Sequence, residues 1–382
     1  MTLKVAKRGS ISPFIVMDVM RAASIREAKG ENIIHLEVGQ PGTAAPPPVL
    51  QAAHAALDGD HLGYTLAFGI DPLRRRLSQH YQDFYNLSVP AQRIAITTGS
   101  SCGFILAFLS AFDPGDRVAL ANPGYPAYRN ILKALGVEPV GIPVGPRSNF
   151  QPTPEMLDAI EGKLNGLIVA SPSNPTGTMI MHDEMKALVE YCEERGIRLI
   201  SDEIYHGITY DRAACSAMEF SDEAIIVNSF SKYFSMTGWR LGWMVVPEPL
   251  LRSVECLSQN LFISPPTISQ LACVAAFDCR EYLDGHVDKY RLNRDLLIDL
   301  LPKAGFNKLS RADGAFYLYA DVSHMTNDSE EFCRRCLDET GVAITPGIDF
   351  DPERGSQFVR FSFAGPCEDI AAAARRLIDW GR

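Results

Sequence analysis

The sequence predicts an α/β fold with a parallel sheet that is covered by helices on both faces. Two observations predict it: short, almost wholly apolar runs are bounded by Gly, Pro or polar residues, and helical patterns such as DEMKALVEYCEERG (183–196) lie between them. Uninterrupted apolar strands are typical of parallel sheets, because both faces of such a sheet are buried. The predicted strands are RIAIT (93–97), RVALA (117–121), GLIVA (166–170), IRLIS (197–201) and AIIVN (224–228).

From about residue 280 the pattern changes. A long helical pattern at 286–305 leads to alternating strands at 315–322 and 358–363, which is typical of an α+β unit. The N-terminal strand IIHLEV (33–38) has no obvious place in the parallel sheet, so we expect it to pack with that unit. The predicted domains are a large one at 46–280 and a small one made of 1–45 with 281–382. Further helices are predicted at 46–57 and 104–112.

Length and composition describe an ordinary globular chain. Its 382 residues exceed one domain of roughly 150 residues, and 46% are hydrophobic. Acidic residues outnumber basic ones, 46 against 36, and the formal charge of −10 argues against a nucleic-acid partner. The apolar stretches are much shorter than the about 18 residues that cross a membrane, and no apolar signal-peptide core follows the basic start. We expect neither a membrane partner nor a signal peptide.

Nine cysteines are scattered without the spacing of a disulfide framework. In a chain of this length they indicate reduced thiols and a cytoplasmic location. Cys333 and Cys336 form a lone CxxC pair, but Phe332 and Leu337 share their helical face. Core packing is therefore a better interpretation of this pair than a zinc or redox site, and no metal site is predicted.

Polar residues follow the predicted strands at the point where each strand ends. Ligands of open parallel sheets bind beyond the carboxyl ends of the strands, so these residues are the candidates for a functional site. The segments concerned are Thr98–Ser101 after RIAIT, SPSNPTG (171–177) after GLIVA, Asp202–Tyr205 after IRLIS, and Ser229–Lys232 after AIIVN.

Each candidate also has a plain structural interpretation. Ser100 and Ser101 at a helix start are suited to a phosphate, with Ser229 and Arg240 as further donors, although Ser-Gly clusters often make only turns and caps. Lys232 lies among aromatic and hydroxyl residues, where loss of water would lower its pKa and favour Schiff-base chemistry, although most lysines are surface charges. Together the segments supply an anion cradle, an amine, an acid and an arginine. Pyridoxal phosphate would use all of them.

Four segments resemble the signatures of the class I/II aminotransferases, which have the fold-type I architecture and depend on pyridoxal phosphate. The segments are SPSNPTG, DEIY (202–205), SFSKYFSMTGWRLGW (229–243) and FVRFSFA (358–364). The likeness extends from EVGQPG (37–42) to the strand with Arg360. It implies a mostly parallel seven-stranded sheet between helices, a smaller α+β domain, and ping-pong transfer of an amino group from an α-amino acid to a 2-oxoacid.

The resemblance also implies roles for individual residues. Lys232 is similar to the lysine that forms the Schiff base and moves the proton, and Asp202 to the acid that pairs with the pyridine nitrogen. Tyr205 and Asn174 are similar to the donors to the ring oxygen, and Tyr125 to the aromatic that stacks on the ring. The remaining implied residues are Ser100, Ser101, Ser229 and Arg240 for the phosphate, Tyr64 for the phosphate of a neighbouring subunit in a homodimer with shared sites, and Arg360, Gly39, Asn174 and Phe14 for the substrate.

Two departures from the family pattern concern substrate choice. The late loop that usually reads GSAFG reads GIDFD (347–351), so the mouth of the site is expected to differ. Some aspartate-using relatives carry a lysine at the position of Ser101, and its absence argues against aspartate. An aromatic or neutral amino-acid donor is compatible with Phe14, Phe316 and Tyr317.

Two other functions compete with transamination. GSSCG (99–103) between a strand and a helix matches the GxSxG pattern of serine hydrolases, with Asp202 and His206, His286 or His324 as possible partners of Ser101. That interpretation leaves Lys232, Arg240 and Arg360 unexplained. A pyridoxal-phosphate-dependent carbon–sulfur β-lyase would use the same cofactor residues, so the sequence separates it poorly from an aminotransferase.

Overall fold

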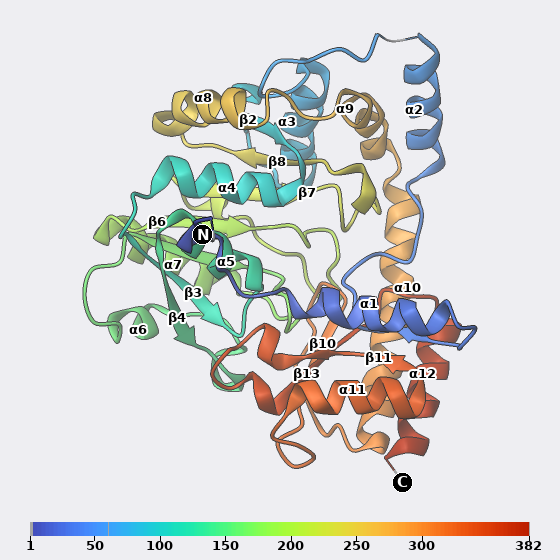
Figure 1. Cartoon of the computed structure of the whole chain (residues 1–382). Helices are drawn as coiled ribbons and strands as arrows, with labels where there is room; N and C mark the ends of the chain where they lie inside the picture. The colour runs from blue at the N-terminus through green and yellow to red at the C-terminus, as the bar shows by residue number, and fades with distance from the viewer. Residues whose placement is uncertain (1–2, 60, 382) are drawn as a thin grey trace.

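A computed structural model describes residues 3–59 and 61–381 and contains a central seven-stranded sheet (Figure 1). The strand order is β2-β8-β7-β6-β5-β3-β4. Strands β3 to β7 run parallel to one another, whereas β8 pairs antiparallel with both β7 and β2. The strands are β2 (Ile94–Thr97), β3 (Arg117–Asn122), β4 (Glu138–Pro143), β5 (Gly166–Ala170), β6 (Arg198–Asp202), β7 (Ile225–Ser229) and β8 (Gly242–Val245).

Both faces of this sheet are buried, which explains the uninterrupted apolar strands. Alternate residues of one strand enter different cores: Leu167 joins one cluster and Ile168 the other. Helices α4 (Gly99–Ala111), α5 (Pro126–Leu135) and α8 (Leu251–Leu261) contribute to one core. Helices α3 (Asp71–Tyr85), α7 (His182–Arg195) and α9 (Thr267–Cys273) contribute to the other. The predicted α/β class with a mostly parallel sheet is confirmed.

A second, antiparallel sheet lies in the C-terminal part, with the order β12-β13-β10-β9. The long helix α10 (Arg280–Leu300) leads to it from the central sheet (Figure 1). The N-terminal strand β1 (Ile34–His35) pairs with β11 (Val342–Ala343), not with the central sheet. The other elements here are β9 (Lys308–Leu309), β10 (Tyr317–Asp321), β12 (Thr345–Pro346), β13 (Phe358–Ser362), α1 (Ile15–Glu27), α11 (Ser329–Thr340) and α12 (Cys367–Trp380).

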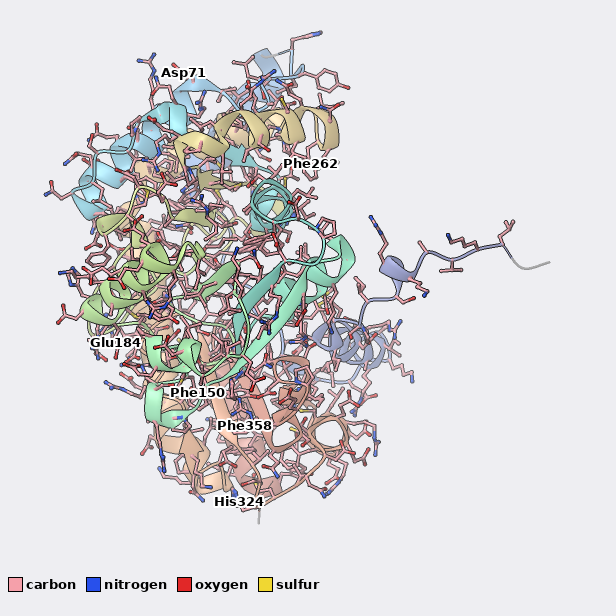
Figure 2. All side chains as sticks on the ribbon, turned by 90° about the vertical axis from the view of Figure 1, so that its left-hand side faces the viewer. Asp71, Phe150, Glu184, Phe262, His324 and Phe358 are labelled. Atoms are coloured by element: carbon pink, nitrogen blue, oxygen red, sulfur yellow. The ribbon has the colours of Figure 1, made fainter. Side chains whose placement is uncertain are left out.

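Figure 2 shows side chains filling the molecule from the end with Asp71 and Phe262 to the end with Phe358 and His324. Helix α2 (Pro47–Gly59) stands at the outer edge of the first end in Figure 1 and contacts α9. The short α6 (Pro154–Asp158) lies beside α7. None of the helices within the described residues is long and apolar enough to span a membrane.

Several boundaries differ from the predictions for local reasons. Helix α4 begins at Gly99, five residues before the predicted apolar run, because its first turn is the Gly-Ser-Ser segment. Helix α10 begins at Arg280, before the predicted start at 286, and ends at Leu300, where a 3-10 turn continues to Ala304. Cys333 and Cys336 are buried in α11, which agrees with their expected role in packing.

Candidate active site

A cavity of about 560 Å³ lies where the carboxyl ends of the parallel strands meet α1 and the second sheet. It brings together segments that are hundreds of residues apart in the chain. The sequence-predicted residues that line it are Phe14, Gly39, Ser100, Ser101, Tyr125, Asn174, Asp202, Tyr205, Lys232, Arg240 and Arg360. Two predicted residues, Ser229 and Tyr64, are not among the residues lining it.

Lys232 follows β7 and extends its amine into the cavity. The amine Nζ donates to the carbonyl oxygen of Gly39 at 2.5 Å and lies 5.9 Å from the centre of the Tyr205 ring. Burial, reinforced by the positive charge of Arg360, lowers the pKa of Lys232 to about 8. A sizeable fraction of this amine is therefore neutral near pH 7 to 8, which is the nucleophilic form.

Asp202 is buried at the carboxyl end of β6. One of its oxygens accepts a hydrogen bond from the backbone N–H of Ile204 at 3.1 Å, and the other accepts one from the hydroxyl of Tyr128. Burial raises the pKa of Asp202 to about 6, although both hydrogen bonds act in the opposite direction. A cationic group placed beside this carboxyl would favour its ionised form.

Tyr128 is a site residue that the sequence analysis missed. It lies on α5, one turn after Tyr125, and is buried between Tyr125 and Phe104. The only signal in the sequence is the spacing of the two tyrosines in GYPAY, where Pro126 begins the helix and places both on the same face.

Arg360 lies on β13 and is only 2% exposed, although the residues on either side of it in FVRFSF are apolar and alternation would turn it away from them. Its guanidinium donates to Oδ1 of Asn174 at 2.8 Å, to the carbonyl of Glu37 and to the hydroxyl of Thr345 at 3.2 Å. None of these acceptors is a carboxylate, and Nε has no partner. A buried guanidinium without a carboxylate partner is suited to bind the carboxylate of a ligand.

Asn174 and Tyr205 lie between Lys232 and Arg360, and hydrogen bonds fix the orientation of both side chains. Asn174 turns its oxygen toward Arg360, which leaves its amide N–H₂ free to face the cavity. The hydroxyl of Tyr205 lies 2.7 Å from that of Tyr317, whose ring stacks on the Arg360 guanidinium at 4.4 Å. Gly39 must be glycine here, because a Cβ would lie 1.9 Å from the Tyr317 hydroxyl.

The opposite end of the cavity is suited to an anion. Ser100 and Ser101 lie in the first turn of α4, whose backbone N–H groups and helix dipole favour negative charge. A Cβ on Gly99 would lie 2.4 Å from the Arg240 guanidinium, so glycine allows the arginine to approach the helix start. Ser229 instead donates inward to the Leu241 carbonyl at 3.1 Å, and its neighbour Ser231 lines the cavity.

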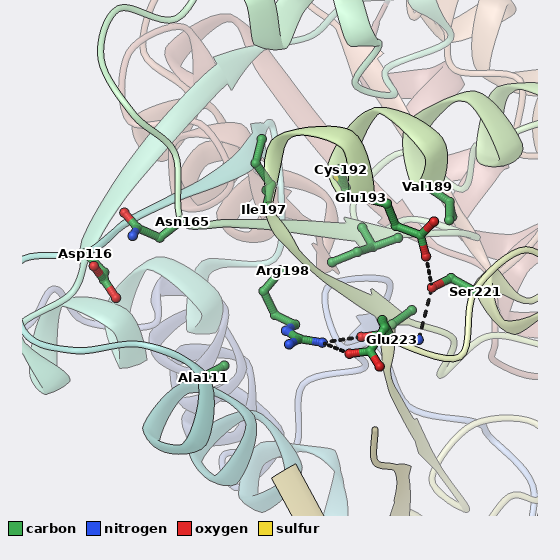
Figure 3. Close-up of a pocket in the computed structure, with 13 residues that line it drawn as sticks. Ala111, Asp116, Asn165, Val189, Cys192, Glu193, Ile197, Arg198, Ser221 and Glu223 are labelled. Atoms are coloured by element: carbon green, nitrogen blue, oxygen red, sulfur yellow. Dashed lines mark hydrogen bonds and ion pairs between the residues drawn. The ribbon is translucent and has the colours of Figure 1, made fainter. Parts of the chain in front are cut away.

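A second cavity of about 540 Å³ lies at the amino ends of the parallel strands (Figure 3). Its polar groups pair with one another: Arg198 donates to Glu223 Oε2 at 3.1 Å, and the Ser221 hydroxyl donates to Glu193. It contains no amine and no unpartnered buried charge among its described residues. The cavity at the carboxyl ends is therefore the candidate active site.

The arrangement does not support a serine hydrolase. Among the described residues that line the candidate site, none is a histidine. His206 is buried behind it, with Nε2 donating to the Ser171 carbonyl and Nδ1 accepting from Tyr85. His286 lies on α10, and His324 contacts the Gly305 carbonyl at 2.9 Å. Ser101 thus has no general base from among these side chains.

Comparisons with known proteins agree with this geometry. The model of the family "Aminotransferase class I and II" matches residues 31–377. The chain belongs to this family. It is 52% identical to the valine–pyruvate aminotransferase of Mycobacterium tuberculosis, over the whole chain and 99% of that protein.

Solved structures of aminotransferases share the fold over the full length. One from M. tuberculosis superimposes with a TM-score of 0.97 at 51% identity, covering 99% of both chains. The Thermus thermophilus aspartate aminotransferase with maleate gives a TM-score of 0.92 at 30% identity, covering 99% of this chain and all of that one. The chain is thus an aminotransferase of fold-type I, and these enzymes use pyridoxal phosphate.

The cavity of this aminotransferase fits that cofactor by its own chemistry. It offers an amine of lowered pKa, a buried carboxyl, and an anion-binding helix start where Gly99 lets the Arg240 guanidinium approach closely. The Nε of Arg360 has no partner and is available to a substrate carboxylate. The relatives named above are aminotransferases, which supports transamination over the β-lyase alternative.

Proposed function

We propose that this aminotransferase transfers the amino group of an aliphatic monocarboxylic α-amino acid, such as valine or alanine, to a monocarboxylic 2-oxoacid, such as pyruvate. The observation that carries the proposal is the division of charge in the cavity. Its three basic side chains are Lys232, Arg240 and Arg360, and each has a separate task in the scheme below. None of these three side chains is left to bind a second carboxylate of the substrate.

Arg360 binds the α-carboxylate of the substrate in this scheme. Its guanidinium is buried, stacked between Tyr317 and Phe350, and fixed by Asn174 and the Glu37 carbonyl. The fixed fork would orient the substrate as well as bind it, since a planar guanidinium matches both oxygens of a carboxylate. That anchoring presents the bond from the α-carbon to hydrogen toward Lys232 and favours proton transfer over loss of carbon dioxide.

The cofactor residues are proposed from the same geometry. When bound, pyridoxal phosphate supplies an aldehyde that takes up amino groups and a ring that draws electrons from the α-carbon. Lys232 would bond to it and carry the proton, Asp202 would pair with the ring nitrogen, and Tyr125 would cover the ring face. Tyr205 and Asn174 would donate to the ring oxygen. Ser100, Ser101 and Arg240 would bind the phosphate, with Tyr64 of a second chain. The Ser229 hydroxyl would join them only after leaving the Leu241 carbonyl to which it donates here.

Apolar side chains support an aliphatic donor. Phe14, Val16, Met17 and Val38 line the cavity on the side of α1. The 52% identical relative from M. tuberculosis is named for valine and pyruvate, which agrees with such a wall. A branched aliphatic side chain gains free energy against these residues by burial, whereas a carboxylate would lose its water there without a partner.

The experiment is a panel of amino donors mixed with the holoenzyme while the visible absorbance of the cofactor is recorded. Valine, alanine, leucine, phenylalanine and aspartate are compared, and the spent enzyme is then regenerated with pyruvate or 2-oxoglutarate. We expect valine or alanine to give the highest kcat/KM and pyruvate to regenerate the enzyme. Preference for aspartate and 2-oxoglutarate would contradict the proposal. Release of pyruvate and ammonia from cystathionine without an acceptor would also contradict it.

We also infer a homodimer. Tyr64 is 84% exposed and cannot serve its own site, while Leu66, Leu57, Leu50 and Ile263 expose further apolar surface on α2 and nearby segments. Contact with a second copy would bury this surface and bring Tyr64 to the partner's phosphate site. Two domains, at 46–280 and at 1–45 with 281–382, and a cytoplasmic location remain parts of the proposal. The nine unpaired cysteines support the latter.

A further inference from the structure

The first turn of α1 forms the apolar wall of the site, yet it has no cap of its own. The residue at the N-cap position is Phe14, which has no side-chain acceptor. The first N–H groups of a helix need acceptors, and burial makes their absence costly. In this chain the acceptors come from Asp349, more than 300 positions away in the sequence.

Asp349 lies in the GIDFD segment that departs from the family pattern. Its carboxylate is 1% exposed, and its two oxygens accept from the N–H groups of Ile15 and Val16, each at 3.2 Å. The negative charge also lies at the positive end of the α1 dipole. One side chain thereby fixes the position and the direction of the first turn.

The backbone around Asp349 is itself fixed to the opposite wall of the cavity. Arg129 of α5 donates to the carbonyls of Asp349 and Phe350, the latter at 3.3 Å. Helix α5 begins directly after Tyr125, whose ring meets that of Phe14 edge to face at 5.8 Å. A closed ring of contacts therefore runs from α1 through Asp349 and Arg129 to α5 and back to α1. Figure 1 shows α1 beside the second sheet, and α1 contacts β12 of that sheet and β11 of the separate β1–β11 pair.

We propose that Asp349 is a positioning residue for donor selectivity: its carboxylate fixes the first turn of α1, so that Val16 and Met17 form a rigid wall for an aliphatic side chain. Asp349 is not among the residues that line the cavity, so it would act through α1 and not by contact with the substrate. A rigid wall discriminates between side chains that differ by one or two methyl groups, whereas a loose wall adapts to both. This inference rests on the proposed aliphatic donor.

The test compares Asp349→Ala with a matched helix-cap variant. Asp328 caps α11 by accepting from the Glu331 N–H at 3.1 Å and lies away from the cavity, so Asp328→Ala removes a similar bond. We expect Asp349→Ala to lower the ratio of kcat/KM for valine over alanine by about fivefold or more, mainly through KM for valine. Asp328→Ala should leave this ratio unchanged. Asp349→Asn, which keeps one acceptor oxygen, should give an intermediate ratio.

A second readout does not depend on turnover. Amide hydrogen exchange of the cofactor-free protein should be faster at Ile15 and Val16 in Asp349→Ala, and unchanged there in Asp328→Ala. Unchanged selectivity in Asp349→Ala, or an equal change in Asp328→Ala, would overturn the inference. If the wild-type enzyme accepts no aliphatic donor, the proposed function fails instead. The exchange measurement then still shows whether Asp349 fixes the helix.

Discussion

Behind the cavity, His206 joins two of the loops that line it. It follows the Asp202–Tyr205 turn, and its Nε2 donates at 2.9 Å to the carbonyl of Ser171 in the loop of Asn174. Its Nδ1 accepts from the Tyr85 hydroxyl at 2.8 Å, so both ring nitrogens are used by a neutral imidazole. Burial lowers the pKa of His206 to about 3, and the ring stays neutral across the physiological range.

Replacing Tyr85 by phenylalanine tests this connection. The change leaves Nδ1 of His206 buried without its donor, and we expect a loss of about 1 to 3 kcal/mol in the free energy of unfolding. The dissociation constant for pyridoxal phosphate should rise several-fold, because the loop of Asn174 loses its fixed partner. Denaturant unfolding and a fluorescence titration of the cofactor measure the two effects.

Tyr81→Phe is the control for that substitution. Tyr81 lies one turn earlier on α3, and its hydroxyl accepts from Trp243 Nε1 at 3.1 Å without reaching either loop. It should lose comparable stability while binding the cofactor as the wild type does. Equal cofactor affinity in the Tyr85 and Tyr81 variants would contradict the proposed connection.

At the scale of single residues, the sequence predicts the site residues that lie at the carboxyl end of a strand. Asp202 ends β6, and Asn174 and Lys232 lie in the segments just beyond β5 and β7, so topology alone brings them to one edge of the sheet. Tyr128 and Asp349 were not predictable in this way. Their roles depend on which helix packs against which loop, and local sequence patterns do not predict that packing.

At the scale of elements, the start of α4 depends on one glycine. Gly99 has φ +73°, and a Cβ there would lie 2.4 Å from the Arg240 guanidinium. We expect Gly99→Ala to cost about 1 to 2 kcal/mol of stability through backbone strain, and to weaken phosphate binding because Arg240 must move. The melting temperature and the dissociation constant of inorganic phosphate from the cofactor-free protein test both effects.

Gly285→Ala on α10 is expected to change the stability in the opposite direction. A Cβ at this helical glycine meets nothing within 4 Å. The substitution should raise stability by about 0.5 to 1 kcal/mol, since alanine loses less backbone entropy in a helix. If Gly99→Ala bound phosphate as tightly as the wild type, the approach of Arg240 would not depend on the glycine at this position.

The strands that the sequence analysis missed have clear physical causes. Strand β4 reads EPVGIP, and its two prolines and one glycine argue against a strand, yet they are tolerated because β4 lies at the edge of the sheet. Strand β8, GWMV, begins at Gly242 inside the lysine segment 229–243, and the sequence analysis interpreted those residues as part of the motif. The parallel strands were predicted because burial on both faces of the sheet gives each of them an uninterrupted apolar run.

At the scale of the whole molecule, His35 links stability to pH. Its two ring nitrogens contact Glu37 at 2.7 Å and Glu27 of α1 at 3.0 Å. The hydrogen bond with Glu37 raises the pKa of His35 to about 9, above the value of 6.5 for a free histidine. The stabilisation is therefore complete below pH 6.5 and is lost as pH rises through 9. The melting temperature should fall over this range, and His35→Gln should reduce the fall.

Mixed dimers test whether two chains share each site. Lys232→Ala removes the amine, and Tyr64→Ala removes the exposed hydroxyl. In a mixed dimer one of the two sites would hold Lys232 from one chain and Tyr64 from the other. At limiting cofactor, an equal mixture refolded together should show activity from about a quarter of the sites, above the mean of the two parents. Activity that never exceeds that mean would argue against shared sites.

The pairing of β1 with β11 has a consequence for synthesis on the ribosome. Glu37 and its hydrogen-bond partner Thr345 are 308 positions apart, so the N-terminal wall of the cavity is made long before the segment that completes it. At translation rates of roughly 5 to 20 residues per second, the nascent N-terminus waits about 15 to 60 seconds. During that interval it exposes an apolar strand without its partner, the kind of surface that is prone to aggregate until the chain is complete.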